Sequence, residues 1–249
     1  MNAFLRFVVL IPLCATSLFS NACTSAIVSG RFTKDGRPLL WKNRDTESLH
    51  NKLMYFTDGR YDCIGLVNAD DSLGKEIWMG MNSKGFAIMN TASYNLNIGD
   101  TSKAKDREGL IIKRALQQCA NLIDFEELLA KLPKPYGVEA NFGAIDAEGN
   151  GAFFETSNSG FTRFDVNDPS VAPMGYLIRT NYSYSGKPDQ GQGYIRYATE
   201  EKLFYNAAAT GNLSLDFLVH DAPRSLYHSL TGTDLSIVDE GNPESAKFA

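Results

Sequence analysis

The order in which strand-like and helix-like segments follow one another constrains the fold of this chain most. Short apolar or alternating runs separated by turn residues fill residues 23–93, and a helical pattern follows at 106–131. Strand-like runs return at 141–157 and 175–183, and the pattern of 193–222 is helical again. This order, without a linker or a repeat, predicts one α+β domain in which sheets pack between helical layers.

The first two strand-like runs are predicted to form a hairpin. CTSAIVSG begins at Cys23 and PLLWKNRD ends at Asp45, and the segment between them contains an Asp-Gly pair, a strong signal for a tight turn. The hairpin returns the second run to the side of Cys23. Because side chains alternate along a strand, Asn43 and Asp45 are expected on one face and Lys42 and Arg44 on the other.

The helical segment at 106–121 is expected to bury one face. Its apolar residues at helical spacing are Leu110, Ile111, Ala115, Leu116 and Cys119. Asp124 is predicted to cap a second helix that ends before Pro133. The stretch NFGAIDAEGNGAFFETS is typical of a hairpin with the turn Ala-Glu-Gly-Asn.

Residues 1–22 resemble a cleaved export signal. One arginine precedes an apolar run at 7–13, and the small residues Ser20 and Ala22 stand three positions and one position before Cys23. The apolar run is too short to span a bilayer. We therefore expect cleavage after residue 22 and export to a periplasmic or extracellular space. The working domain would be 23–249, with Cys23 as its first residue.

A lipoprotein signal is the alternative, because it also ends at a cysteine and attaches lipid to the sulfur. Such signals prefer leucine and a small residue where this chain has Ser20 and Asn21, so the fit is poor. Lipid on Cys23 would anchor the protein to a membrane and block chemistry at its sulfur and amine. Without it, no stable membrane anchor is expected.

The composition excludes several classes of function. The chain has 24 basic and 29 acidic residues and a net charge of −5. Removal of the leader, which contains one arginine, changes the net charge to −6. An acidic chain disfavours a nucleic-acid surface, so no nucleic-acid partner is expected. The partner that the chemistry considered below predicts is a small-molecule amide. The oligomeric state stays open, and a homo-oligomer is one of the options.

Three of the four cysteines follow the leader, and this odd number excludes a complete disulfide framework. Cys63 and Cys119 are expected in the core. The three histidines are scattered and there is no metal-binding motif, so neither a Cys–His pair nor a metal or other cofactor is expected.

A cysteine at the start of a chain carries a nucleophile and a base in one residue. Its α-amine has a pKa near ~8 and can take the thiol proton without a histidine. The site then needs a carboxylate to orient the amine, donors for an oxyanion and positive charge near the sulfur. Asn90 and Asn181, at the ends of apolar strand-like runs, are candidate oxyanion donors.

The segment CTSAIVSGRFTKDGRPLLWKNRD resembles the start of the N-terminal-nucleophile (Ntn) hydrolases that act on linear amides, the penicillin acyltransferase (C45-type) and choloylglycine hydrolase relatives. The resemblance continues through GMNSKGFAIMNT, NFGAIDAEGNGAFFETS and IRTNYS. It implies an αββα sandwich, in which two antiparallel sheets lie between helical layers. The relatives continue with further strands, so we expect C-terminal strands to be missing here.

The resemblance also implies roles for individual residues. Cys23 matches the nucleophile and its amine the base, and Asp45 matches the carboxylate that orients the amine. Asn181 matches an oxyanion-hole asparagine. Asn90 matches a second one, although its spacing from the preceding turn is shorter than in the bile salt enzymes.

The basic positions depart from the family pattern. The relatives have an arginine three residues before the aspartate, where this chain has Lys42, while Arg44 lies directly beside Asp45. A lysine keeps the charge and loses the fork of donors. A later arginine of the family matches Arg196 best.

These observations predict an exported amidase that cleaves a non-peptide C–N bond through a thioester at Cys23. An acyltransferase that delivers the acyl group to another amine, a dipeptidase of the terminal-cysteine type and a lipid-anchored, non-catalytic binding protein are the alternatives. Apolar residues at 53–56, 78–81 and 182–184 are candidates for an acyl pocket.

Overall fold

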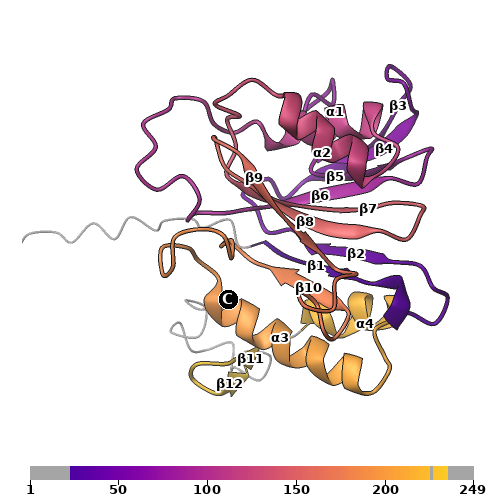
Figure 1. Cartoon of the computed structure of the whole chain (residues 1–249), viewed down its shortest axis with the longest axis vertical. Coiled ribbons are helices and arrows are strands. Elements are labelled where there is room, and N and C mark those ends of the chain that lie inside the picture. The colour runs from indigo at the N-terminus through magenta and orange to yellow at the C-terminus, as the bar shows by residue number, and fades with distance from the viewer. Residues whose placement is uncertain (1–22, 225–226, 235–249) are drawn as a thin grey trace, which may run out of the picture.

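The computed structural model describes residues 23–224 and 227–234. The predicted leader and the end of the chain lie outside the described residues, so the predictions about them stay open. The described part has four layers, with two antiparallel sheets in the middle and helices on both outer faces (Figure 1). The predicted αββα architecture is confirmed.

The larger sheet has seven strands, and each pairs with the next in chain order. In that order they are β3 (Asn51–Phe56), β4 (Cys63–Asn68), β5 (Met79–Asn82), β6 (Ala87–Ala92), β7 (Ala140–Ile145), β8 (Gly151–Thr156) and β9 (Phe161–Asp165). Helices α1 (Glu108–Gln118) and α2 (Leu122–Lys131) interrupt the series between β6 and β7 and cover the outer face (Figure 1).

The smaller sheet has the order β10-β1-β2, so β1 (Thr24–Val28) lies between β2 (Leu39–Asn43) and β10 (Tyr176–Arg179). Its outer face carries α3 (Tyr194–Ala209) and α4 (Leu215–His220) (Figure 1). Short elements complete the described chain: the 3-10 turns Gly30–Phe32 and Ala222–Arg224, and the strands β11 (Tyr227–His228) and β12 (Thr233–Asp234).

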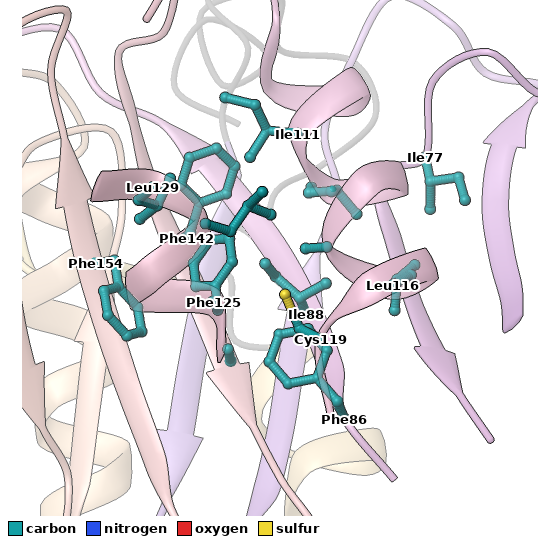
Figure 2. Packing of buried hydrophobic residues seen from close by; sticks show 14 of the residues in the cluster. Ile77, Phe86, Ile88, Ile111, Leu116, Cys119, Phe125, Leu129, Phe142 and Phe154 are labelled. Atoms are coloured by element: carbon teal, nitrogen blue, oxygen red, sulfur yellow. The ribbon is translucent and has the colours of Figure 1, made fainter. Parts of the chain in front are cut away.

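The main core lies between the larger sheet and its two helices (Figure 2). Phe125 of α2 is fully buried at its centre. Its ring contacts Phe86, Phe142 and Phe154 at centroid distances of 6.1, 5.8 and 5.1 Å. These aromatic contacts hold the helical layer to β7, to β8 and to the residue directly before β6.

Three local predictions are corrected. Leu110 is 46% exposed, whereas Ile112 is buried, because the buried face of α1 runs through Ile111 and Ile112 and turns the preceding residue outward. Asn121, not Asp124, caps α2, since its side chain accepts from the Asp124 amide. Asp124 instead accepts from the amide of Ala120. Strand β9 was not predicted.

None of the helices in the described residues is long and apolar enough to cross a membrane.

We predict that Phe125→Ala lowers the free energy of unfolding by about 3–5 kcal/mol, because it opens a cavity where three other rings meet. Leu110→Ala is the matched control, and its change should stay within about 0.5 kcal/mol since the side chain is largely in solvent. Urea unfolding followed by circular dichroism measures both. Equal losses for the two variants would contradict the packing described here.

Candidate active site

The predicted first hairpin is present and brings two cations beside Cys23. Strand β1 pairs with β2 so that Ser25 lies opposite Lys42, and in the same register Cys23 lies opposite Arg44. The Ser25 hydroxyl lies 3.5 Å from the hydroxyl of Thr91 on the larger sheet. This face of the hairpin therefore points between the sheets, and Cys23, which is 7% exposed, is enclosed there.

Lys42 contacts Asn90 and lies within electrostatic range of Cys23. Its ammonium group donates to the Asn90 Oδ1 at 3.2 Å and to the main-chain oxygen of Trp78 at 3.5 Å. The pairing of β5 with β6 ends at Met79 and Met89, so both acceptors lie just beyond the last paired residues. Burial lowers the pKa of Lys42 to about 8. The charge of Cys23 opposes this shift, whereas the positive charge of Arg44 lowers the pKa further.

Arg44 spans from the hairpin to the larger sheet. Its guanidinium donates to the Oδ1 atoms of Asn51 at 2.5 Å and Asn68 at 2.8 Å, and lies 5.4 Å from the Trp78 ring centroid. Burial lowers its pKa, and the charge of Cys23 opposes that shift. The sequence left open which of Lys42 and Arg44 lies near the nucleophile, and the structure brings both into its electrostatic range.

Arg196 contacts both the segment that carries Cys23 and the segment that carries Asn181. Its Nη1 donates to the main-chain oxygen of Cys23 at 2.7 Å and to the Thr24 hydroxyl at 3.0 Å, and its Nη2 donates to the Asn181 Oδ1 at 2.6 Å. Burial lowers the pKa of Arg196, while the charges of Cys23 and Asp45 oppose the shift. The weak sequence match therefore falls on a residue that contacts Cys23 directly.

Asn181 is fully buried directly after β10. Its Nδ2 donates to the main-chain oxygen of Ala92 at 3.0 Å, and within the described residues the second hydrogen of this group has no acceptor. The Nδ2 of Asn90 likewise has no acceptor among the described residues, because the contact with Lys42 uses its oxygen. Both amides thus have a hydrogen that can be donated to a substrate.

Asp45 approaches Cys23 through its main chain. The Cys23 Sγ donates to the main-chain oxygen of Asp45 at 3.4 Å. The Asp45 side chain is exposed, and its carboxylate acts on the charge of Arg196. The structure therefore brings together all seven residues that the sequence proposed: Cys23, Lys42, Arg44, Asp45, Asn90, Asn181 and Arg196.

Sequence reasoning missed two neighbours of the site. Tyr94, in the loop after β6, has a raised pKa because of burial and the charge of Cys23, with Arg196 opposing. Thr24 accepts from Arg196 and follows Cys23 in the Cys-Thr pair, so the sequence offered a signal for it. Tyr94 offered none, because a loop residue reaches the site only through the tertiary fold.

Sequence reasoning also missed a fully buried ion pair. Arg179 at the end of β10 donates through Nε to Glu155 on β8 at 2.7 Å, and both side chains are 0% exposed. Glu155 also accepts from the amides of Tyr184 at 2.9 Å and Ser185 at 2.7 Å. The pair joins the two sheets and fixes both ends of the short segment that carries Asn181.

The described residues contain no group of three or more His, Cys, Asp or Glu side chains that could hold a metal ion. Cys63 and Cys119 are buried, free thiols on the helix-facing side of the larger sheet.

Residues 31–206 match the family described as acyl-coenzyme A:6-aminopenicillanic acid acyl-transferase. No curated protein matches the sequence. Among solved structures, the N-acylethanolamine-hydrolyzing acid amidase ortholog of Caenorhabditis elegans has 14% identity and a TM-score of 0.55, with 91% of this chain and 96% of that chain covered. This similarity shows the same fold.

Two further solved structures are longer than this chain and match it over part of their own length. A mutant of the conjugated bile acid hydrolase of Clostridium perfringens has 17% identity and a TM-score of 0.46, with 72% of this chain and 57% of that chain covered. The penicillin V acylase of Agrobacterium tumefaciens has 13% identity and a TM-score of 0.37, with 91% and 61% covered. The chain thus spans about three fifths of the length of these two proteins.

We predict that Glu155→Gln lowers the free energy of unfolding by about 3–5 kcal/mol, because it leaves the buried Arg179 charge without its counter-ion. Adding Arg179→Met to Glu155→Gln should recover at least half of the loss. Glu127→Gln, which breaks an exposed ion pair with Lys131, is the control and should cost under about 1 kcal/mol. Denaturant unfolding would contradict this view if the double variant were less stable than the single one.

Proposed function

The chain belongs to the acyl-coenzyme A:6-aminopenicillanic acid acyl-transferase family, and from this premise we propose that Cys23 is the nucleophile that cleaves a linear, non-peptide C–N amide bond. Amide hydrolysis and acyl transfer are the chemistry of this family and of its structural relatives. The observation that carries the proposal is the set of contacts through which Arg196 links the Cys23 main chain to Asn181.

The proposed base is the α-amine of Cys23, which removal of residues 1–22 would create. An α-amine with a pKa near ~8 is partly neutral at working pH and can take the thiol proton. The exposed Asp45, whose main-chain oxygen lies 3.4 Å from the Cys23 Sγ, is the carboxylate proposed to orient the amine. Lys42 and Arg44 would favour the thiolate through their positive charge.

In the proposed reaction the Cys23 sulfur attacks the amide carbon and forms a C–S bond. The Nδ2 groups of Asn181 and Asn90 donate to the oxyanion of the tetrahedral intermediate. The C–N bond then breaks, and the leaving amine takes the proton held by the Cys23 amine. Water attacks the thioester, which releases the acid and returns the proton to the thiol.

An apolar strip beside Cys23 supports an apolar acyl group in the substrate. Six residues form a block on the inner face of β3, β4 and β5, in which each strand contributes two: Leu53, Tyr55, Ile64, Leu66, Met79 and Met81. Leu53, Tyr55 and Met81 are 67%, 65% and 51% exposed. The block begins two residues from Asn51 and Asn68, which Arg44 contacts from the hairpin.

The strip corrects one sequence-based expectation. Of residues 53–56, only Leu53 and Tyr55 lie on this face, because Met54 and Phe56 point to the core under the helices. We propose that the acyl group of the substrate lies on the strip with its carbonyl carbon at Cys23.

The family name favours a second acceptor besides water. An acyltransferase would pass the acyl group from the same thioester to an amine. Product analysis with and without a competing amine separates the two activities, since a transferase yields a new amide whose share rises with amine concentration.

We propose that the protein is exported and that Cys23 is its first residue. Intact-mass measurement of the protein secreted by a host cell should give a chain that begins at Cys23, and a slow amide substrate should add one acyl group to it. Cys23→Ala should abolish that adduct and lower kcat by at least about 10³-fold. A chain that keeps its leader, or one that carries diacylglycerol on the sulfur, refutes the nucleophile and favours the anchored binding protein.

The strip predicts a dependence on the length of the acyl chain. Leu53→Lys should raise KM about tenfold for an amide with a long aliphatic acyl group and leave the KM of an acetyl amide unchanged, because only the long chain reaches the strip. Leu73→Lys is the control, since Leu73 is equally exposed at 68% and lies in a turn outside the strip. Steady-state kinetics on a series of chain lengths makes the comparison, and equal effects of the two variants would argue against the strip.

A further inference from the structure

One buried carboxyl group next to Arg196 has no role in the reaction described so far. Arg196, Glu200 and Phe204 follow one another at intervals of four residues on α3, so they lie on one face of the helix. Arg196 contacts Cys23, as described above. Phe204 packs against the rings of Trp41 and Tyr176 at centroid distances of 6.2 and 5.3 Å.

Glu200 thus lies between the candidate site and an apolar cluster. It is 7% exposed, and its Oε2 has no hydrogen-bond partner among the described residues. A carboxylate in such a place is costly, because nothing replaces the water that it loses. A residue with a purely structural role here would be apolar, like Phe204 one turn further on.

We propose that Glu200 is a positioning residue for the amide-cleaving site and acts through Arg196 on the contacts with Cys23 and Asn181. The inference rests on the proposed function. While Glu200 is neutral, Arg196 stays on the Cys23 main-chain oxygen and the Asn181 side chain. Once Glu200 is ionised, its carboxylate competes for the guanidinium, and the oxyanion donor Asn181 loses the contact that orients it.

The electrostatics agree with this geometry. Burial raises the pKa of Glu200 to about 8, and Arg196 opposes the shift. The other groups whose charges act on Arg196 are Cys23 at the start of β1, Asp45 after β2 and Tyr94 after β6. Tyr227 of β11 packs against the same turn of α3, where its main-chain oxygen accepts from the Thr199 hydroxyl at 2.9 Å. Glu200 is therefore a buried carboxyl that changes charge near working pH and whose charge acts on Arg196.

The test measures kcat/KM of Glu200→Gln and of the wild type, both as the full chain, from pH 6 to 9.5. The quantity compared is the value for the variant divided by the value for the wild type. Glutamine keeps the neutral form at every pH. The ratio should be flat below pH 7 and rise about tenfold by pH 9, since a group with a pKa of about 8 is then roughly nine-tenths ionised. Groups that titrate alike in the two proteins cancel in the ratio.

Glu201→Gln is the matched control. Glu201 is the next residue of the helix and accepts from the Tyr176 hydroxyl at 3.0 Å, away from Arg196. Its kcat/KM ratio to the wild type should stay flat with pH. Glu200→Leu, which also lacks the charge, should reproduce the rise of Glu200→Gln and serves as a second variant.

A readout without substrate separates this inference from the proposed function. Because folding raises the pKa of Glu200, the contribution of Glu200 to wild-type stability should fall as pH rises from about 4.5 to about 8. The Tm of Glu200→Gln should therefore rise relative to that of the wild type across that range. A flat activity ratio together with this Tm trend overturns the positioning role. If no amide is turned over by either protein, the proposed function itself fails.

Discussion

The ion pair between Arg179 and Glu155 is the contact on which the geometry of the site depends. It is fully buried and joins the smaller sheet to the larger one at the end of β10. The guanidinium carbon also lies 5.1, 5.0 and 3.7 Å from the ring centroids of Phe153, Phe164 and Tyr184. A charge buried in this way is stable only with its counter-ion in place, so the pair favours the arrangement of the two sheets that brings Arg179 to Glu155.

That register places the functional groups of two sheets at one point. Asn181 follows Arg179 by two residues, and the amides of Tyr184 and Ser185 return the chain to Glu155. The contacts of Arg179 and of the Tyr184 and Ser185 amides with Glu155 therefore hold the chain on both sides of Asn181. Arg196 adds a contact with the Asn181 side chain. Arg196 then connects this segment to Cys23, which lies 158 positions earlier in the chain than Asn181.

Charge is distributed unevenly around Cys23. Lys42 approaches from β2, Arg44 from the residue after it and Arg196 from α3. Asp45 meets the Cys23 sulfur through its main-chain oxygen, and its side chain is exposed. Lys42, Arg44 and Arg196 thus place positive charge around Cys23. The apolar strip on β3, β4 and β5 lies beside this charged centre. The candidate site thus combines a few charged and polar groups with an apolar surface.

The sequence by itself determined most of the local elements, with β9 as an exception, and, together with the family resemblance, the identity of the candidate residues. The hairpin of β1 and β2 followed from its Asp-Gly turn and its alternation, both of which are local signals. The tertiary structure decided which neighbours those residues meet. Neither the Glu155–Arg179 pair nor Tyr94 could be found from local pattern, because each depends on how one sheet packs on the other. The burial of Leu110 and the capping role of Asp124 were predicted wrongly for a related reason. Packing against the sheet sets which face of α1 is buried, and Asn121 caps α2 in place of Asp124.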